Sequence, residues 1–108
     1  MVPKKDPPRL SYKGLLVLKA FLDAYDQKEL VGADIMRAAG ISSGTMYPLL
    51  IRFEKSGFLE SRWEDGDPTK LGRPRRRLYR LTAAGDVFTR ARLRELSPER
   101  LTSQPALS

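Results

Sequence analysis

The sequence predicts a mainly α-helical fold with one small β-hairpin, and three observations lead to this expectation. Residues 41–58 carry helix signals at both ends, two short strand-like runs follow at 58–64 and 75–82, and residues 83–96 form a second amphipathic stretch. Apolar side chains recur every three or four residues in the helical stretches and alternate in the strand-like ones. A helix, a hairpin and a basic loop in this order predict a winged helix-turn-helix.

Residues 41–58 are the stretch around which the chain is organised. Ser42 or Ser43 can accept a hydrogen bond from the free N–H groups of a first helical turn, and Gly57 can adopt the left-handed conformation that ends a last one. The helix is expected to tolerate Pro48 near its start. Its apolar stripe consists of Met46, Leu49, Leu50 and Phe53. The opposite face carries hydroxyl groups and an arginine, so one face packs and the other is free to bind.

Two shorter helices precede this stretch. Ser11 is expected to cap a first helix that ends at about Tyr25, and residues 30–32 are expected to form a very short strand. The wide apolar face of that helix comprises Leu15, Leu16, Leu18, Phe21, Leu22 and Tyr25. Residues 33–39 are expected to form a second helix, apolar at Ile35, Ala38 and Ala39, with Gly40 as its stop. Two helices joined by a tight glycine turn present the second helix to a major groove.

The hairpin and its loop carry the positive charge. Alternation predicts that Leu59, Tyr79 and Leu81 face the core, and Trp63 is expected to pack in the core or on the hairpin. The loop at 65–75 is expected to be a flexible wing without helix, because it is rich in glycine and proline. The stretch from residue 70 to residue 80 contains six cations and no acid. The cations are Lys70, Arg73, Arg75, Arg76, Arg77 and Arg80. A solvated charge run is the alternative interpretation.

Arginines in the wing have different expected roles. Arg73 lies between Gly72 and Pro74, and this arrangement predicts a guanidinium that projects from a narrow loop tip into a minor groove. The following three arginines are expected to contact phosphates, although alternation should turn one of them toward the protein. Asp65 and Asp67 are expected to form turns and to bind no metal.

Thr82 is expected to cap the last helix, at residues 83–96, whose apolar side comprises Val87, Phe88, Ala91 and Leu96. The expected organisation is a flexible basic arm at 1–10, one domain at 11–96 and a flexible tail at 97–108. The acidic residues after the first helix, Asp23, Asp26 and Glu29, are expected to be exposed charges of a connector.

Composition narrows the function. The chain has 108 residues, 20 Lys and Arg against 13 Asp and Glu, and a net charge of +7, which favours polyanions as partners. Cysteine and histidine are absent, so disulfides, thiolate metal sites and the usual nucleophile–base pairs are excluded. We expect no enzyme, no cofactor, no metal site and no membrane span, and we expect a cytoplasmic location.

Five blocks of sequence carry a family resemblance. They are Gly44-Thr45-Met46-Tyr47-Pro48-Leu49-Leu50, Glu54-x-x-Gly57-Phe58-Leu59, Trp63, Gly72-Arg73-Pro74-Arg75-Arg76 and Tyr79-Arg80-Leu81-Thr82-x-x-Gly85. Together they closely resemble the PadR family of winged-helix transcriptional regulators over about residues 11–94. The resemblance implies a DNA-binding, repressor-like homodimer in which the first and last helices, the latter at 83–96, contribute to dimerisation. The drug-stacking tryptophan of the family's last helix has no counterpart here, so a small-molecule effector is not indicated.

We therefore expect a sequence-specific regulator, a repressor, that binds double-stranded DNA as a homodimer through a recognition helix at 43–56 and a basic wing at 65–75. The residues expected to contact DNA are Ser42, Ser43, Thr45, Tyr47, Arg52, Lys70, Arg73, Arg75, Arg76 and Arg77. Two alternatives stay open. One is a winged-helix module that binds an acidic protein, and the other is an RNA-binding domain.

Overall fold

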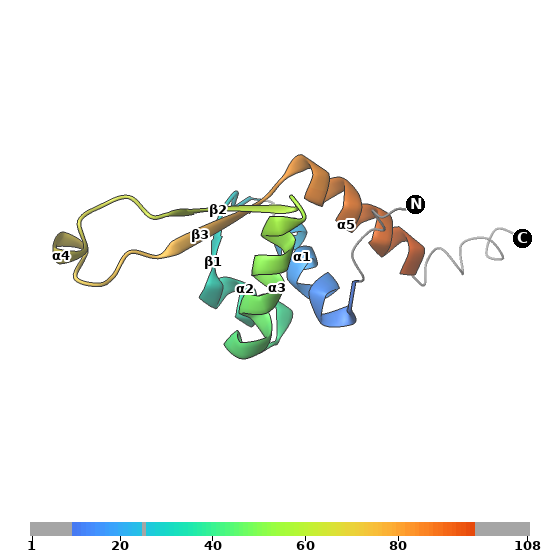
Figure 1. Cartoon of the computed structure of the whole chain (residues 1–108), viewed down its shortest axis with the longest axis horizontal. Coiled ribbons are helices and arrows are strands. Elements are labelled where there is room, and N and C mark those ends of the chain that lie inside the picture. Colours follow the sequence, from blue (N-terminus) through green and yellow to red (C-terminus); the bar gives the residue numbers. More distant parts are fainter. Residues whose placement is uncertain (1–9, 25, 97–108) are drawn as a thin grey trace, which may run out of the picture.

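The computed structural model describes residues 10–24 and 26–96, which form five helices and a three-stranded antiparallel sheet (Figure 1). The elements are α1 (Tyr12–Asp23), β1 (Leu30–Val31), α2 (Gly32–Ala39), α3 (Ser43–Lys55), β2 (Leu59–Trp63), α4 (Pro68–Leu71), β3 (Arg77–Leu81) and α5 (Ala83–Leu96). The strand order is β1-β3-β2. This arrangement confirms the predicted winged helix. The predicted arm and tail lie outside the described residues, apart from Leu10.

Helix α1 begins as its sequence predicts. The Ser11 hydroxyl accepts a hydrogen bond from the Gly14 N–H at 3.0 Å, which satisfies one of the free donors of the first turn. The helix ends at Asp23, slightly earlier than expected, and Tyr25 falls outside the described residues. The apolar face is wide, since Leu15, Leu18 and Phe21 are all buried.

The core lies where α1, α2 and α3 meet the inner face of the sheet (Figure 1). Its fully buried side chains are Val17, Leu18, Ile35, Met46, Leu50 and Phe53. Burial of each such side chain stabilises the fold by roughly 1.5–3 kcal/mol. The apolar stripe predicted for α3 is therefore confirmed. Of the three apolar residues named for α2, Ile35 and Ala39 are buried, whereas Ala38 is exposed.

A tight turn joins α2 to α3. Gly40 adopts a left-handed conformation with φ of 69°, and its N–H donates to the Met36 carbonyl at 2.8 Å, as expected of a helix stop. Ser42 occupies the N-cap position of α3, but its side chain accepts no backbone N–H. Instead its hydroxyl donates to the Thr45 hydroxyl at 3.4 Å. The cap position is as predicted, and the cap hydrogen bond is not.

The hairpin pairs β2 with β3 in a register that sets Trp63 opposite Arg77 and Ser61 opposite Tyr79. Leu59 and Tyr79 are buried as predicted. Trp63 is 57% exposed, so the expectation of a packed tryptophan is wrong as far as the core is concerned. Burial falls from Leu59 to Trp63 because the strand runs outward past the helices.

The wing contains a short helix in a segment whose glycines and prolines predicted a loop. Helix α4 starts at Pro68, and the Asp67 carboxylate accepts the Thr69 N–H at 3.0 Å. Gly72 ends it in a left-handed conformation. Figure 1 shows α4 at the far end of the wing, away from the other helices. Asp67 therefore makes a cap, in keeping with the turn role expected for it.

Helix α5 docks through its first two turns. The Gly85 N–H donates to the Thr82 hydroxyl at 3.0 Å, which confirms the predicted cap, and the Phe88 ring stacks on Phe58 with centroids 4.3 Å apart. Val87 and Leu96, both expected on the packed side, are exposed. Within residues 10–24 and 26–96, no helix is long and apolar enough to cross a bilayer.

Candidate nucleic-acid interface

A cleft of about 690 Å³ lies between the start of α2, the exposed side of α3 and the base of the wing. Tyr47 contributes from α3 and Trp63 from β2. The remaining lining residues are Val31, Gly32, Ala33, Asp34, Arg37, Arg75, Arg76, Arg77 and Tyr79. Tyr47 of the expected recognition helix and three arginines at the base of the wing therefore border the same hollow.

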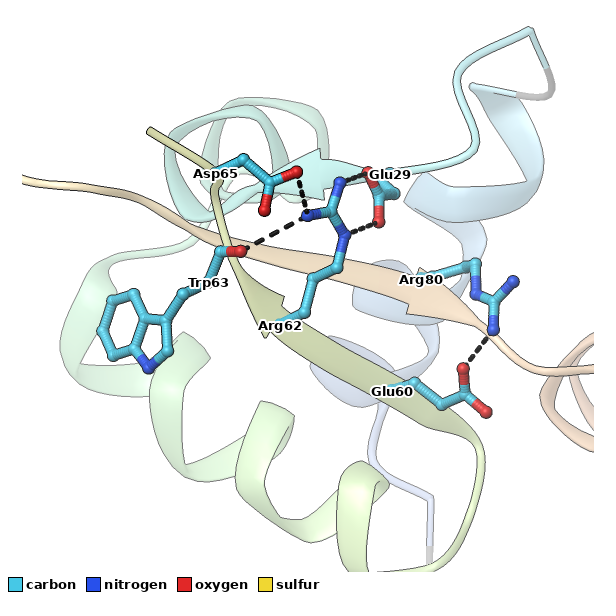
Figure 2. A network of polar contacts seen from close by, with 6 residues as sticks. All are labelled: Glu29, Glu60, Arg62, Trp63, Asp65 and Arg80. Carbon is cyan, nitrogen blue, oxygen red and sulfur yellow. Dashed lines mark hydrogen bonds and ion pairs between the residues drawn. The ribbon is translucent and has the colours of Figure 1, made fainter. Parts of the chain in front are cut away.

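The outer face of the hairpin, which points away from this cleft, is electrically neutralised. Figure 2 shows Arg62 reaching across the sheet to Glu29, with Nε and Nη2 2.8 and 2.9 Å from the two carboxylate oxygens. Arg62 also lies 3.7 Å from Asp65, and Arg80 pairs with Glu60. The hydrogen bond from Arg62 lowers the pKa of Glu29. Glu29, expected to be an exposed connector charge, is thus half-buried in an ion-pair network.

The cleft side of the wing, in contrast, carries arginines without an acid partner. Among the ion pairs of the described residues, none includes Arg75 or Arg76, and both are exposed. Lys70 at the wing tip and Arg52 on α3 are likewise exposed and outside these pairs. The unneutralised positive charge of the hairpin is therefore concentrated beside α3 and at the wing.

Arg77 turns toward the protein. Its Nε donates to the Ser61 hydroxyl at 3.1 Å, and that hydroxyl in turn donates to Glu54 of α3. The guanidinium carbon lies 4.9 Å from the centre of the Trp63 ring, which is a cation–π contact. Strand alternation predicted that one arginine of the run points inward, and this arginine is Arg77. Its placement favours a supporting role over a direct phosphate contact.

Arg73 does not project from a loop tip, so that expectation is wrong. Its Nη1 and Nη2 lie 2.7 and 3.0 Å from the two carboxylate oxygens of Glu64, and the Arg73 side chain is only 32% exposed. The acid that meets it precedes the wing in sequence, whereas the basic run itself contains none. An ion pair across the base of the wing therefore takes the place of the projecting guanidinium.

The residues expected on the binding face of α3 lie on its accessible side. Ser42, Ser43, Tyr47 and Arg52 are exposed, and Thr45 is half-buried beside the Ser42 hydroxyl. Hydroxyl groups thus gather at the amino end of α3, where free backbone N–H groups favour a phosphate. The polar side of this helix is not buried in its own fold.

Two side chains of the interface were not among the expected DNA contacts, Trp63 and Glu64. Figure 2 shows the Trp63 indole turned away from the outer ion-pair network. Knowledge of the cross-strand register would have identified both residues, because Trp63 pairs with Arg77 and Glu64 lies beside Arg76. That register is a tertiary feature which a single strand pattern does not fix.

Comparison with known proteins agrees with this geometry. The model of the transcriptional regulator PadR-like family matches residues 22–91. The structure of a PadR family transcription regulator from Clostridium difficile is similar with a TM-score of 0.67 and 22% identity, covering 91% of this chain and 100% of that one.

Further solved structures have the same fold. A PadR family transcriptional regulator from Eggerthella lenta has a TM-score of 0.62 and 24% identity over 89% of this chain and 84% of that one. The protein smu.1704 from Streptococcus mutans has a TM-score of 0.63 and 24% identity over 87% and 88%. The comparison with curated proteins finds no match. Since the family model matches well over half of the residues, this chain belongs to the PadR-like family of transcriptional regulators.

Proposed function

We propose that this regulator binds double-stranded DNA as a homodimer, with α3 in the major groove and the wing along the neighbouring backbone, and that it acts as a repressor. Membership of the family supports DNA binding in general. The observation that carries the proposal is the charge distribution of the hairpin. Its outer face is neutralised by ion pairs, while unpaired Arg75 and Arg76 face the cleft that α3 borders.

Each part of the interface then has a chemical role. The hydroxyls of Ser42, Ser43, Thr45 and Tyr47 donate to phosphates or base edges near the start of α3, and Arg52 extends this contact along the helix. Lys70, Arg75 and Arg76 neutralise phosphates along the wing. Arg77 contributes by holding Trp63 and Ser61 in place rather than by reaching the backbone.

Exposed apolar side chains of α5 support the homodimer. Val87 and Leu96 are both exposed on this helix, and a second copy of the chain would cover such side chains. Two copies of α3 would enter successive major grooves about 34–36 Å apart, so the operator should contain a two-fold repeat. Occupation of such a site within a promoter would exclude the transcription machinery, and this is the basis of repression.

Selection of binding sites from random duplexes tests the proposal most directly. The expected result is an enriched sequence with two-fold symmetry, bound by a species of twice the chain mass in solution. A competition among duplex DNA, structured RNA and heparin separates the other functions. Preference for structured RNA, or equal displacement by heparin and any duplex, would argue against a sequence-specific DNA regulator.

The salt dependence of binding should reveal how many phosphates the protein neutralises. If each protomer neutralises roughly four, the logarithm of the association constant should fall with the logarithm of salt concentration at a slope of about −7. Fluorescence anisotropy of a labelled operator, measured over a series of KCl concentrations, gives this slope. A slope near zero would mean that the basic wing does not meet the backbone.

Trp63 should report binding directly. It is the only tryptophan of the chain, it is 57% exposed, and it borders the cleft that we assign to DNA. Addition of operator DNA should therefore quench and shift its emission, because the ring loses water and approaches the duplex. The Trp63→Phe variant provides the background from tyrosine. Unchanged emission at DNA concentrations that produce a complete mobility shift would place the duplex elsewhere.

A further inference from the structure

The carboxylate of Glu64 lies where the wing leaves the sheet. It accepts two hydrogen bonds from the Arg73 guanidinium, at 2.7 and 3.0 Å, and its Oε1 also accepts the backbone N–H of Arg76 at 3.2 Å. The Glu64 N–H donates to the Arg76 carbonyl at 2.7 Å. One side chain therefore connects the segment that enters the wing to two residues of the segment that returns from it.

This connection is built from strong contacts. A fork of two charge-assisted hydrogen bonds is the most directional pairing available to arginine, and both side chains are largely covered, at 24% and 32% exposure. The pKa of Glu64 falls to about 2, first because of the Arg73 hydrogen bonds and then because of the Arg76 N–H. A folded-state pKa below that of a free carboxyl means that the contact is fully present at neutral pH. It is lost only as the pH falls toward about 2.

The segment from 73 to 76 is fixed as a consequence. Arg73 also donates to the Pro74 carbonyl at 3.1 Å, and the proline ring limits its own backbone rotation. Arg75 lies between these fixed points, and the Arg76 backbone is held at both its N–H and its carbonyl. The two unpaired arginines of the cleft therefore project from a backbone that Glu64 holds.

The rest of the wing has little support. Residues 65–72 are all exposed, and the Arg62–Asp65 ion pair at 3.7 Å joins the wing to the sheet only at its first residue, so the clasp at the base limits the directions in which the wing can point. A wing free to move would have to be ordered when DNA binds, and this loss of conformational freedom opposes association.

We propose that Glu64 is a positioning residue for DNA binding, whose carboxylate fixes the base of the wing so that Arg75 and Arg76 are directed at the phosphates. The inference rests on the proposed function and adds to it a residue with the opposite charge to that of a DNA contact.

The direction in which Glu64→Gln changes the affinity for DNA tests the inference. An acid near a DNA-binding surface repels phosphates, so its neutralisation ordinarily strengthens binding. If Arg73 were itself a minor-groove contact, Glu64→Gln would release it and binding would again be strengthened. The clasp alone predicts weaker binding, because glutamine cannot accept both guanidinium hydrogen bonds and turns its own N–H groups toward Arg73.

Asp65 offers a matched control at the next position. Its side chain is 98% exposed and lies 3.7 Å from Arg62, outside the clasp. Glu64→Gln and Asp65→Asn remove the same charge from neighbouring positions. We expect Glu64→Gln to weaken operator binding about tenfold or more, by the loss of a preorganised contact, and Asp65→Asn to leave it unchanged or tighter.

Arg73 provides a second, independent test. Arg73→Lys keeps the charge but cannot bridge both carboxylate oxygens, so it should weaken binding as Glu64→Gln does. The double variant Glu64→Gln/Arg73→Ala should bind no more weakly than Glu64→Gln alone, because both changes open one clasp. If the double variant instead binds the operator more weakly than Glu64→Gln alone, Arg73 contacts DNA by itself.

Binding is measured by anisotropy on the selected operator, and thermal melting of each variant shows whether the core is intact. Failure of the wild-type chain to bind any duplex would refute the proposed function. Binding by the wild type, with equal or tighter binding by Glu64→Gln and Arg73→Lys, would refute only the clasp.

Discussion

Replacement of Gly85 by alanine is expected to destabilise the domain by about 3–5 kcal/mol, the largest effect on folding that we expect from the addition of a single methyl group. A Cβ at this position would lie 2.2 Å from the carbonyl oxygen of Phe58 and 2.8 Å from a Leu81 methyl group. The first of these neighbours is backbone and cannot rotate away. Helix α5 would therefore have to move off the corner between α3 and β2.

The contacts that this movement would break are specific. The Thr82 N–H donates to the same Phe58 carbonyl at 3.0 Å, and the Thr82 hydroxyl donates to the Gly57 carbonyl at 2.6 Å. The stacked pair of Phe58 and Phe88 would separate as well. Each lost hydrogen bond costs about 1 kcal/mol. These losses add to the steric one, so the variant should unfold at a markedly lower temperature.

Gly44→Ala is the control for this prediction. Gly44 is also a helical glycine, but an added Cβ would meet nothing closer than the Ser42 hydroxyl at 4.0 Å. It should therefore keep or slightly raise the melting temperature, since alanine favours a helix by about 0.5–1 kcal/mol over glycine. Gly85→Ala should lower the melting temperature by about 4–8 °C for each kcal/mol lost. Similar melting of both variants would show that α5 is not docked as described.

The sequence predicted the fold well wherever the signal is local. The caps at Ser11 and Thr82 and the stop at Gly40 depend on a few neighbouring residues, and all three appear in the structure. Helix α4 was missed although Asp67, Pro68 and Gly72 are start and stop signals. A helix of four residues has no apolar stripe, so the periodicity that identified the other helices was absent.

The faces of the hairpin were predicted, but the extent of its burial was not. Alternation predicted Leu59, Tyr79 and Leu81 on the core face, and the cross-strand register places them on one face of the hairpin, with Leu59 and Tyr79 buried. Whether that face is buried at a given residue depends on which helix covers it. The helices cover Leu59 but do not extend as far as Trp63. This difference depends on the packed structure and cannot be read from the strand sequence.

The pairing of charges was the least predictable feature. The acids that neutralise the arginines come from other segments: Glu29 meets Arg62, and Glu64 meets Arg73. A basic run without acids therefore showed no ion pair in the sequence, whereas the fold pairs Arg73 with Glu64. The exposed Val87 and Leu96 show the same limit, because the pattern of α5 does not distinguish a core from a partner.

The double variant Arg75→Ala/Arg76→Ala should bind the operator about 10³-fold more weakly than the wild type at roughly 0.15 M salt. Both residues line the cleft, are exposed and have no acid partner among the ion pairs of the described residues. A homodimer loses four charges in this variant. Each neutralised phosphate contributes about −0.9 to the slope of log association constant against log salt concentration. The slope should therefore become shallower, from about −7 to about −3.5. Anisotropy titrations across KCl concentrations measure both quantities.

Arg80→Ala/Arg90→Ala removes the same charge from each protomer at other places. Arg80 pairs with Glu60 on the outer face, and Arg90 pairs with Asp86 on α5 at 2.6 Å. These exposed pairs contribute little to stability, so the control should fold normally. If net charge alone drew the protein to DNA, both double variants would weaken binding and lower the slope equally. If the cleft is the interface, only the loss of Arg75 and Arg76 changes the slope, because only their charges replace counterions on the duplex.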